Sequence, residues 1–230
     1  MTTSFVQSGG LGTATDASSY LSGTVTAAEG DWVVVAVMIA QASPVPTVTG
    51  VSGAVLGAMT SVVSVADSGT IVRLHVWKKK VGVGGIAEAL TATLSGTALR
   101  GVVIPIVVSG ANATDVVQGS NYDTDSSASA NTLQCALAAF QAGGSVLVFG
   151  LGHEGGYNLT FEAAYTAGTQ INSGEALRGR AAWLVGTQDT AVDVNFSSTN
   201  IMAAAALEIA TAASGIPAGV LAAILEDEGD

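Results

Sequence analysis

The sequence predicts an all-β protein, a jelly-roll-like β-sandwich built from two similar halves and followed by a short C-terminal arm, helical or extended. Three observations predict this fold: a composition rich in strand and turn formers, blocks of sequence that recur in order, and short apolar runs between polar clusters. Of the 230 residues 29 are Gly, while charged residues make up only 11% and aromatic residues 5%. Strand and turn formers therefore dominate over the long charged residues that favour helices.

Three blocks of sequence recur in the same order in both halves of the chain, which indicates an internal duplication. The first block begins in each half with a Gly shortly before an apolar run, and the second places Trp77 and Trp183 in matching strands. The matched blocks are residues 30–37 with 144–151, 73–82 with 179–186, and 90–108 with 192–209. We expect related halves at about residues 20–109 and 131–211.

Hydrophobic periodicity identifies individual strands. In residues 90–94 and 192–196 apolar and polar side chains alternate, so one face packs on the core and the other meets water. By contrast, residues 32–40 and 102–108 are apolar throughout. These two runs are expected to be central strands that are buried on both faces.

The halves are expected to pack together in one β-sandwich domain over residues 1–213. Residues 112–130, between the halves, are rich in Ser and Asp but contain no Pro-rich spacer. A short polar link of this kind favours direct packing over independent motion. Whether the halves form one sandwich or two stays open.

The C-terminal segment, residues 214–230, is expected to be a docking arm outside the sandwich. Pro217 suits the first turn of a short helix, and an acidic end follows. Five apolar residues recur there at helical spacing: Ile216, Val220, Leu221, Ile224 and Leu225. Such a helix is marginal alone, so the stripe needs an apolar groove beside a basic patch. The alternative is a frayed acidic tail.

Charge argues against nucleic acid as a partner. The formal net charge is −11, and the basic cluster at residues 78–80 makes no broad cationic field. This cluster is interpreted as protection of an exposed sheet edge or as a solvated face.

No membrane or secretory segment is expected. The first residues lack the basic and then apolar pattern of a signal peptide. The longest apolar runs, such as residues 32–40, are far shorter than the roughly 20 residues that a membrane helix needs.

Residues that could carry catalysis show no convergent spacing. His75 and His153 fall in strands that the repeat does not match, and no Gly-x-Ser-x-Gly motif occurs. His153 and Glu154 are interpreted as a solvated strand end, and Cys135 as a buried thiol in an apolar run. We therefore expect no enzyme and no cofactor.

One acidic segment resembles the beginning of a calcium loop. Asn121, Asp123 and Asp125 alternate along the chain, but the later Gly and Glu of the full pattern do not follow. Clusters of this kind are typical of plain turns, so we expect no bound metal.

The blocks at residues 30–37, 74–77, 90–97 and 107–111 resemble a β-sandwich module that recurs among structural proteins of tailed bacteriophages. The resemblance spans residues 20–211. It implies a non-enzymatic virion protein, a capsid decoration (cement) protein or a tail-associated or fibre component. Its partners would be copies of itself and other virion proteins, and assembly would take place in the host cytoplasm.

A carbohydrate-binding module for host or surface attachment is the alternative. Such modules expose several aromatic side chains, and this chain has only three Trp, four Tyr and five Phe. Trp77 and Trp183 are expected to anchor the cores of the two halves, which leaves few aromatic residues to stack on sugars.

Overall fold

The computed structural model describes residues 3–40, 44–67, 69, 71–112, 114–127, 129–139, 143–153, 158–174, 176–198 and 201–211. Every regular element within these ranges is a β-strand, and all strand pairs are antiparallel. The strands are β1 (Ser4–Gln7), β2 (Leu11–Thr13), β3 (Ala17–Ala27), β4 (Trp32–Ala40), β5 (Val48–Gly53), β6 (Gly57–Ala58), β7 (Thr60–Ala66), β8 (Val72–Lys80), β9 (Ile86–Ala98), β10 (Arg100–Ser109), β11 (Val117–Asp125), β12 (Thr132–Ala136), β13 (Ser145–His153), β14 (Leu159–Phe161), β15 (Thr166–Ala167), β16 (Ile171–Ser173), β17 (Leu177–Leu184), β18 (Ala191–Phe196) and β19 (Ile201–Ile209). The all-β prediction is confirmed.

The first half of the chain forms two sheets. The first inner sheet has the order β1-β10-β4-β8-β7, and β2 also pairs with β10. The first outer sheet has the order β3-β9-β5-β6. The two sheets enclose the first core, which contains Val35, Trp77 and Leu90.

Strands of the second half pair in the same way. The second inner sheet has the order β11-β19-β13-β17-β15, and β16 also pairs with β17. The second outer sheet has the order β12-β18-β14. A second core between them contains Val148, Val194 and Cys135.

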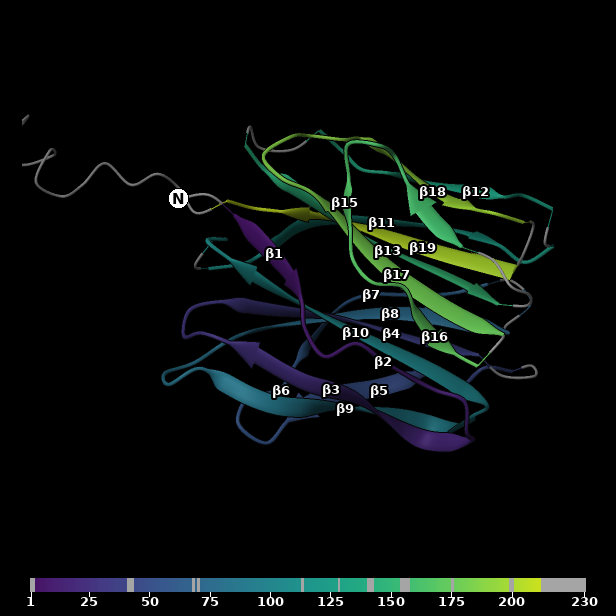
Figure 1. Ribbon diagram of the computed structural model, residues 1–230, viewed down its shortest axis with the longest axis horizontal. Coiled ribbons are helices and arrows are strands. Elements are labelled where there is room, and N and C mark those ends of the chain that lie inside the picture. Colours follow the sequence, from purple (N-terminus) through teal and green to yellow (C-terminus); the bar gives the residue numbers. More distant parts are fainter. Residues whose placement is uncertain are drawn as a thin grey trace, which may run out of the picture.

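The two inner sheets pack face to face, so that four sheets are stacked in layers (Figure 1). Between them lies a shared core that contains Met38, Ile104 and Phe149. Its contacts are reciprocal, because β10 lies across β17 while β19 lies across β8. Each inner sheet is therefore covered on both faces.

Burial explains the apolar runs of the sequence. All nine residues of β4 are buried, with Val34 and Ala36 in the shared core and Val33 and Val35 in the first core. In β10, eight consecutive residues are buried. The expectation of central strands that are buried on both faces is confirmed.

Alternating strands lie in the outer sheets, as expected. In β18, Val192, Val194 and Phe196 are buried in the second core, while the residues between them are half-buried. In β9, Leu90 and Ala92 point inward in the same way. Each outer sheet thus has one packed face and one wetter face.

Strands at two edges were not expected from the sequence. Residues 1–18 precede the first of the two expected halves, but β1 and β2 within them extend the first inner sheet. The polar link at residues 112–130 contains β11, which pairs with β19. These strands have no continuous apolar face, so hydrophobic periodicity does not reveal them.

The two tryptophans do not occupy matching environments. Trp77 is buried in the first core, whereas Trp183 is half-buried, packs on the shared core and stacks on Phe5 with ring centroids 6.0 Å apart. Trp77 pairs with Val35 and Trp183 with Leu147, and these partners also face different cores. The expectation that both tryptophans anchor the cores of their own halves is therefore wrong for Trp183.

Candidate functional site

One end of the first sheet pair carries a hollow of about 610 Å³. The end of β3, the turn after it, the turn between β5 and β6, and the beginning of β9 line this hollow. Its floor includes the buried side chains of Ala27 and Ile86, and its lining is mainly apolar. Val55 stands at the rim with 70% of its surface exposed, and Val83, next to the rim, is 89% exposed.

Glycines shape the turn that closes the hollow between β8 and β9. Gly84 and Gly85 have φ values of 88° and 69°, which L side chains rarely adopt. The Gly85 N–H donates to the Gly82 carbonyl at 3.3 Å, and the Gly84 N–H donates to Glu29 Oε2 at 3.4 Å. A side chain at Gly85 would also approach the Ala27 carbonyl oxygen at 2.8 Å. The turn thus lies tightly against the end of β3.

A carboxylate holds the opposite rim. Glu88 on β9 accepts the backbone N–H groups of Val55 and Leu56 at 2.8 and 2.7 Å. Charge-assisted bonds of this kind are short and fix geometry well. A side chain at Gly53 would overlap the Glu88 carboxylate and displace it from this position. The exposure of Val55 therefore follows from a fixed turn.

The basic run at residues 78–80 ends β8, immediately before the turn that closes the hollow. All three side chains are half-buried, and Lys78 forms an ion pair with Asp115. Because β7 pairs with β8 at Lys78, this strand is not an edge, and the edge-protection interpretation is wrong there. Lys79 and Lys80 extend toward the end of the molecule that bears the hollow.

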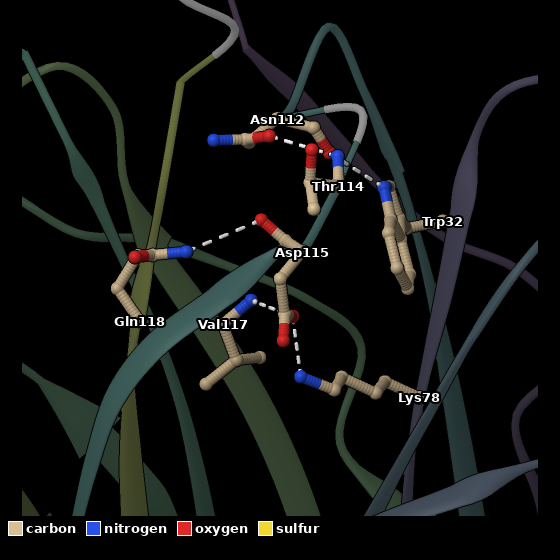
Figure 2. Close-up of polar contacts among 7 residues, drawn as sticks. All are labelled: Trp32, Lys78, Asn112, Thr114, Asp115, Val117 and Gln118. Carbon is tan, nitrogen blue, oxygen red and sulfur yellow. Dashed lines mark hydrogen bonds and ion pairs between the residues drawn. The ribbon is translucent and has the colours of Figure 1, made fainter.

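The ion pair belongs to a polar cluster where the chain passes from one half to the other (Figure 2). Asp115 Oδ1 also accepts the Val117 N–H at 3.0 Å. Trp32 Nε1–H donates to the Asn112 carbonyl at 2.9 Å. The cluster fixes the crossing point against the beginning of β4 and the end of β8.

His75 is buried in β8, beside Trp77. Its Nε2 lies 2.8 Å from Ser61 Oγ, and its ring centroid lies 4.5 Å from that of Trp77. Burial, and secondarily the Arg73 charge, lower the His75 pKa to about 4. Nδ1 has no hydrogen-bond partner among the described residues, so a carboxylate that would complete a catalytic triad is not seen there. The His75 ring is therefore neutral near pH 7, and its contact with Ser61 is a hydrogen bond between two uncharged side chains.

The other histidine closes β13. His153 is the last residue of that strand and is half-buried. His153 thus lies at a strand end as expected, but its ring is half-buried and not fully solvated, while Glu154 lies outside the described residues.

The acidic segment that resembles a calcium loop is a strand, β11, and not a turn. Backbone N–H groups already occupy its oxygen atoms: Tyr122 donates to Asn121 Oδ1 at 2.6 Å, and Gln134 donates to Asp123 Oδ2 at 3.0 Å. Across the part of the chain that the structure describes, no group of three or more His, Cys, Asp and Glu could hold a metal ion.

Asp125 caps the loop that follows β11. Its carboxylate accepts the N–H groups of Ser127, Ser129 and Ala130 at 2.6 to 2.9 Å. Burial acts to raise its pKa, but the hydrogen bonds prevail and lower the pKa to about 2. The charged carboxylate therefore fastens Ser127, Ser129 and Ala130 to the end of β11.

Cys135 is a buried free thiol, as expected. It lies in the second core, and burial raises its pKa to about 12. A thiol in this state is a poor nucleophile at neutral pH.

The five residues expected to dock on a partner, Ile216, Val220, Leu221, Ile224 and Leu225, lie outside the described residues. So does the rest of the expected arm, residues 214–230. Within the described ranges, no helix is long and apolar enough to cross a membrane.

Neither a family model nor a curated protein matches this sequence.

The hollow is the feature that sequence reasoning missed. Its lining comes from three separate places along the chain, residues 26–29, Val55 and residues 84–87. One exposed valine gives a partial signal, because Val83 stands between Gly82 and Gly84 in a segment that predicts a turn. Only the pairing of β9 with both β3 and β5 brings these segments together.

Proposed function

We propose that this chain is a non-enzymatic structural protein of a virion, a capsid decoration (cement) protein or a tail-associated component, that acts through protein–protein contacts. The observation that carries this proposal is the order of strand pairing in the two halves. It is supported further by the resemblance of residues 20–211 to β-sandwich modules of tailed bacteriophages.

The pairing order supports a jelly-roll interpretation of the first half. The strands lie in the order β1-β10-β4-β8 in one sheet and β3-β9-β5-β6 in the other. An eight-strand jelly roll divides its strands in this way, and β6 with β7 acts as one strand that bends between the sheets. Jelly rolls are frequent in viral capsid proteins, although a fold does not fix a function by itself.

A duplication is supported by the second half, where β11-β19-β13-β17 and β12-β18-β14 repeat that order. The reciprocal packing of β10 on β17 and β19 on β8 is what a two-fold dimer would show. We therefore propose that an ancestral homodimer became one chain, with its interface kept as the shared core.

Carbohydrate binding has weaker support. Among the large hydrophobic side chains that are well exposed in the described residues, the only aromatic one is Tyr122. One ring does not make the platform of several aromatics that sugar-binding sites commonly use.

Two measurements test the proposal. Sedimentation velocity over about a hundredfold range of protein concentration should show self-association, because contacts between copies obey mass action. Mass spectrometry of density-purified particles from a culture that encodes this chain should detect it at a fixed copy number per particle. A protein that stays monomeric, is absent from particles and binds on a glycan array would be a carbohydrate-binding module instead.

A further inference from the structure

The first outer sheet is an outermost layer of the molecule, so one of its faces is open to solvent (Figure 1). On β9 the outward positions between residues 87 and 97 hold only Ala, Thr and Ser, and the exposed positions of β3 hold Ser, Thr and Leu21. Glu88 is the one charged residue in the four strands, and its pairing with the buried Val25 directs it inward. Within the described residues of this sheet, the outward face therefore carries no charge.

The outward face of the second outer sheet is different. Strand β18, like β9, pairs with a strand on each side, but its outward positions include Asp193 and Asn195. Gln134 Nε2–H donates to Asp193 Oδ1 at 2.9 Å, and Thr132 Oγ1–H donates to Asn195 Oδ1 at 2.8 Å. This face bears a carboxylate, and its polar side chains bond to one another, as is ordinary for a face in water.

An uncharged face fits a second copy of the same chain. The formal net charge of the chain is −11, so two copies repel each other unless their contact avoids the carboxylates. A basic partner would need carboxylates on this face, and an acidic partner would need lysines or arginines. The cores of protein–protein interfaces are depleted in charged residues, as this face is.

The shape of the face is self-complementary. Leu21 is its largest side chain and is 53% exposed. It pairs with Thr91, and Ala89 is the next outward residue of β9, about 7 Å away along the strand. A two-fold axis can therefore place Leu21 of each copy over Ala89 of the other, because a protrusion and a low area lie side by side on one face. The hollow opens at the end of the same face, since Thr26 and Ala87 line it.

The area of the face is sufficient for a contact between two copies. Strand β9 has 13 residues and is therefore about 40 Å long, and four strands are together about 19 Å wide. Because β5 and β6 are shorter, the face measures about 600 Å², and two such faces would bury about 1,200 Å², at the lower limit of stable specific interfaces. Face-to-face packing of sheets already occurs within this chain, in the shared core.

We propose that the outward face of the first outer sheet is the contact surface between two copies of this chain, related by a two-fold axis, with Leu21 of each copy on Ala89 of the other. The inference rests on the self-association that the proposed function expects, and it does not depend on the virion role.

The test places a charge in the middle of the contact. Ala89 is exposed, so Ala89→Arg leaves the fold intact, and unchanged far-UV circular dichroism and urea midpoint verify this. Sedimentation velocity of the full chain gives the dissociation constant of the dimer. We expect this constant to rise at least about tenfold in Ala89→Arg, because the guanidinium would lose its water without gaining a carboxylate. Leu21→Ser should raise it several-fold, since the protruding side chain is lost.

A matched control uses Ala191→Arg. Ala191 is also exposed, begins β18 and pairs with Ala136 on the outward face of the second outer sheet. This variant makes the same change of residue and of net charge away from the proposed contact. Its dissociation constant should stay within about twofold of the unsubstituted protein's, because distant surface charges act only through screened repulsion.

Salt gives a second measurement. Raising the salt concentration from about 50 to 500 mM should strengthen the association of the unsubstituted protein, because the repulsion between two acidic copies is then screened. Weaker association at high salt would overturn the proposal, since ion pairs would then hold the copies together.

Three further outcomes separate this inference from the proposed function. A protein that stays monomeric at every concentration would overturn the inference. Equal dissociation constants for Ala89→Arg and Ala191→Arg would refute this face and leave the self-association standing. If the chain is absent from purified particles while Ala89→Arg alone weakens the dimer, the contact surface is supported and the virion role is not.

Discussion

The two sheet pairs resemble each other in their inner sheets and differ in their outer ones. Both inner sheets follow a five-strand path with one additional short strand. The first outer sheet, in contrast, has four strands and includes β3 and β9 of 11 and 13 residues, while the three strands of the second have 5, 3 and 6 residues. Sheets that share a core must match each other, whereas outer sheets that face solvent can lengthen and acquire a hollow.

Side-chain volume in the shared core is redistributed between the halves. Strand β10 contributes Ile104 and Ile106, while β19 in the corresponding position of its sheet contributes Ala203 and Ala205. In compensation, Phe149 on β13 pairs with Ala205. Total volume is what a core conserves best, so the two faces fit without having the same residues.

We expect the largest loss of stability from a substitution in the shared core. Phe149→Ala removes a fully buried ring and should lower the free energy of unfolding by about 3–5 kcal/mol. Because this core belongs to both halves, urea unfolding followed by tryptophan fluorescence should stay a single transition at lower urea. Two separated transitions would mean that the halves are independent. Phe161→Ala, at a half-buried ring on β14, is the control with a smaller loss.

A second variant separates the halves at their seam. A side chain on Gly12 of β2 would overlap the backbone carbonyl of Asn172, which belongs to the other half. Gly12→Ala should therefore cost about 1–3 kcal/mol in urea unfolding, since backbone has to move. Gly50→Ala in β5 meets nothing within 4 Å and should be nearly neutral. Similar losses in both variants would contradict a tight seam.

Trp32 and Trp77 are buried to a similar extent but differ in the hydrogen bonds of their indole N–H groups. Trp32 donates to the Asn112 carbonyl, whereas Trp77 Nε1 has no hydrogen-bond partner among the described residues. Trp32→Phe should therefore destabilise the protein by about 1 kcal/mol more than Trp77→Phe does, because only the first leaves a carbonyl without its donor. Thermal unfolding of both variants measures the difference. A larger loss for Trp77→Phe would point to an undetected partner.

The smallest expected effect is on the pH dependence of stability, to which His75 in the first half and Asp125 in the second contribute at different pH. The His75 pKa is about 4 in the folded protein, below the ordinary 6.5, so the unfolded state binds the proton first and stability falls as pH drops from 6.5 to 4. For Asp125 the pKa falls from 3.8 to about 2, so its contribution is lost in that lower window. Urea midpoints at several pH values should show His75→Gln flattening only the upper window and Asp125→Asn only the lower one.

Sequence reasoning predicts the buried strands better than their neighbours. The runs at residues 32–40 and 102–108 are apolar because both of their faces are covered, and that pattern is visible without a structure. Strand β11 is largely polar on both faces, and it pairs with β19 along one edge. Nothing in its periodicity distinguishes such a strand from a loop.

The recurring blocks match Trp77 with Trp183, but they do not predict which face either side chain takes. Trp77 and Trp183 lie in corresponding strands and still point to different cores, because a shift of one residue in alignment reverses every face. The hollow cannot be predicted from the sequence, because its lining comes from strand ends and turns that only long-range strand pairing brings together.

The pairing of β1 with β10 has a consequence for biosynthesis. Ser4 pairs with Ser109, and β11 is placed on β19 only when residues near 202–209 have been made. Strand β1 thus waits unpaired until β10 has been made, and the shared core closes only once β19 has been made. Such non-local topologies fold slowly and leave apolar strands exposed while they fold.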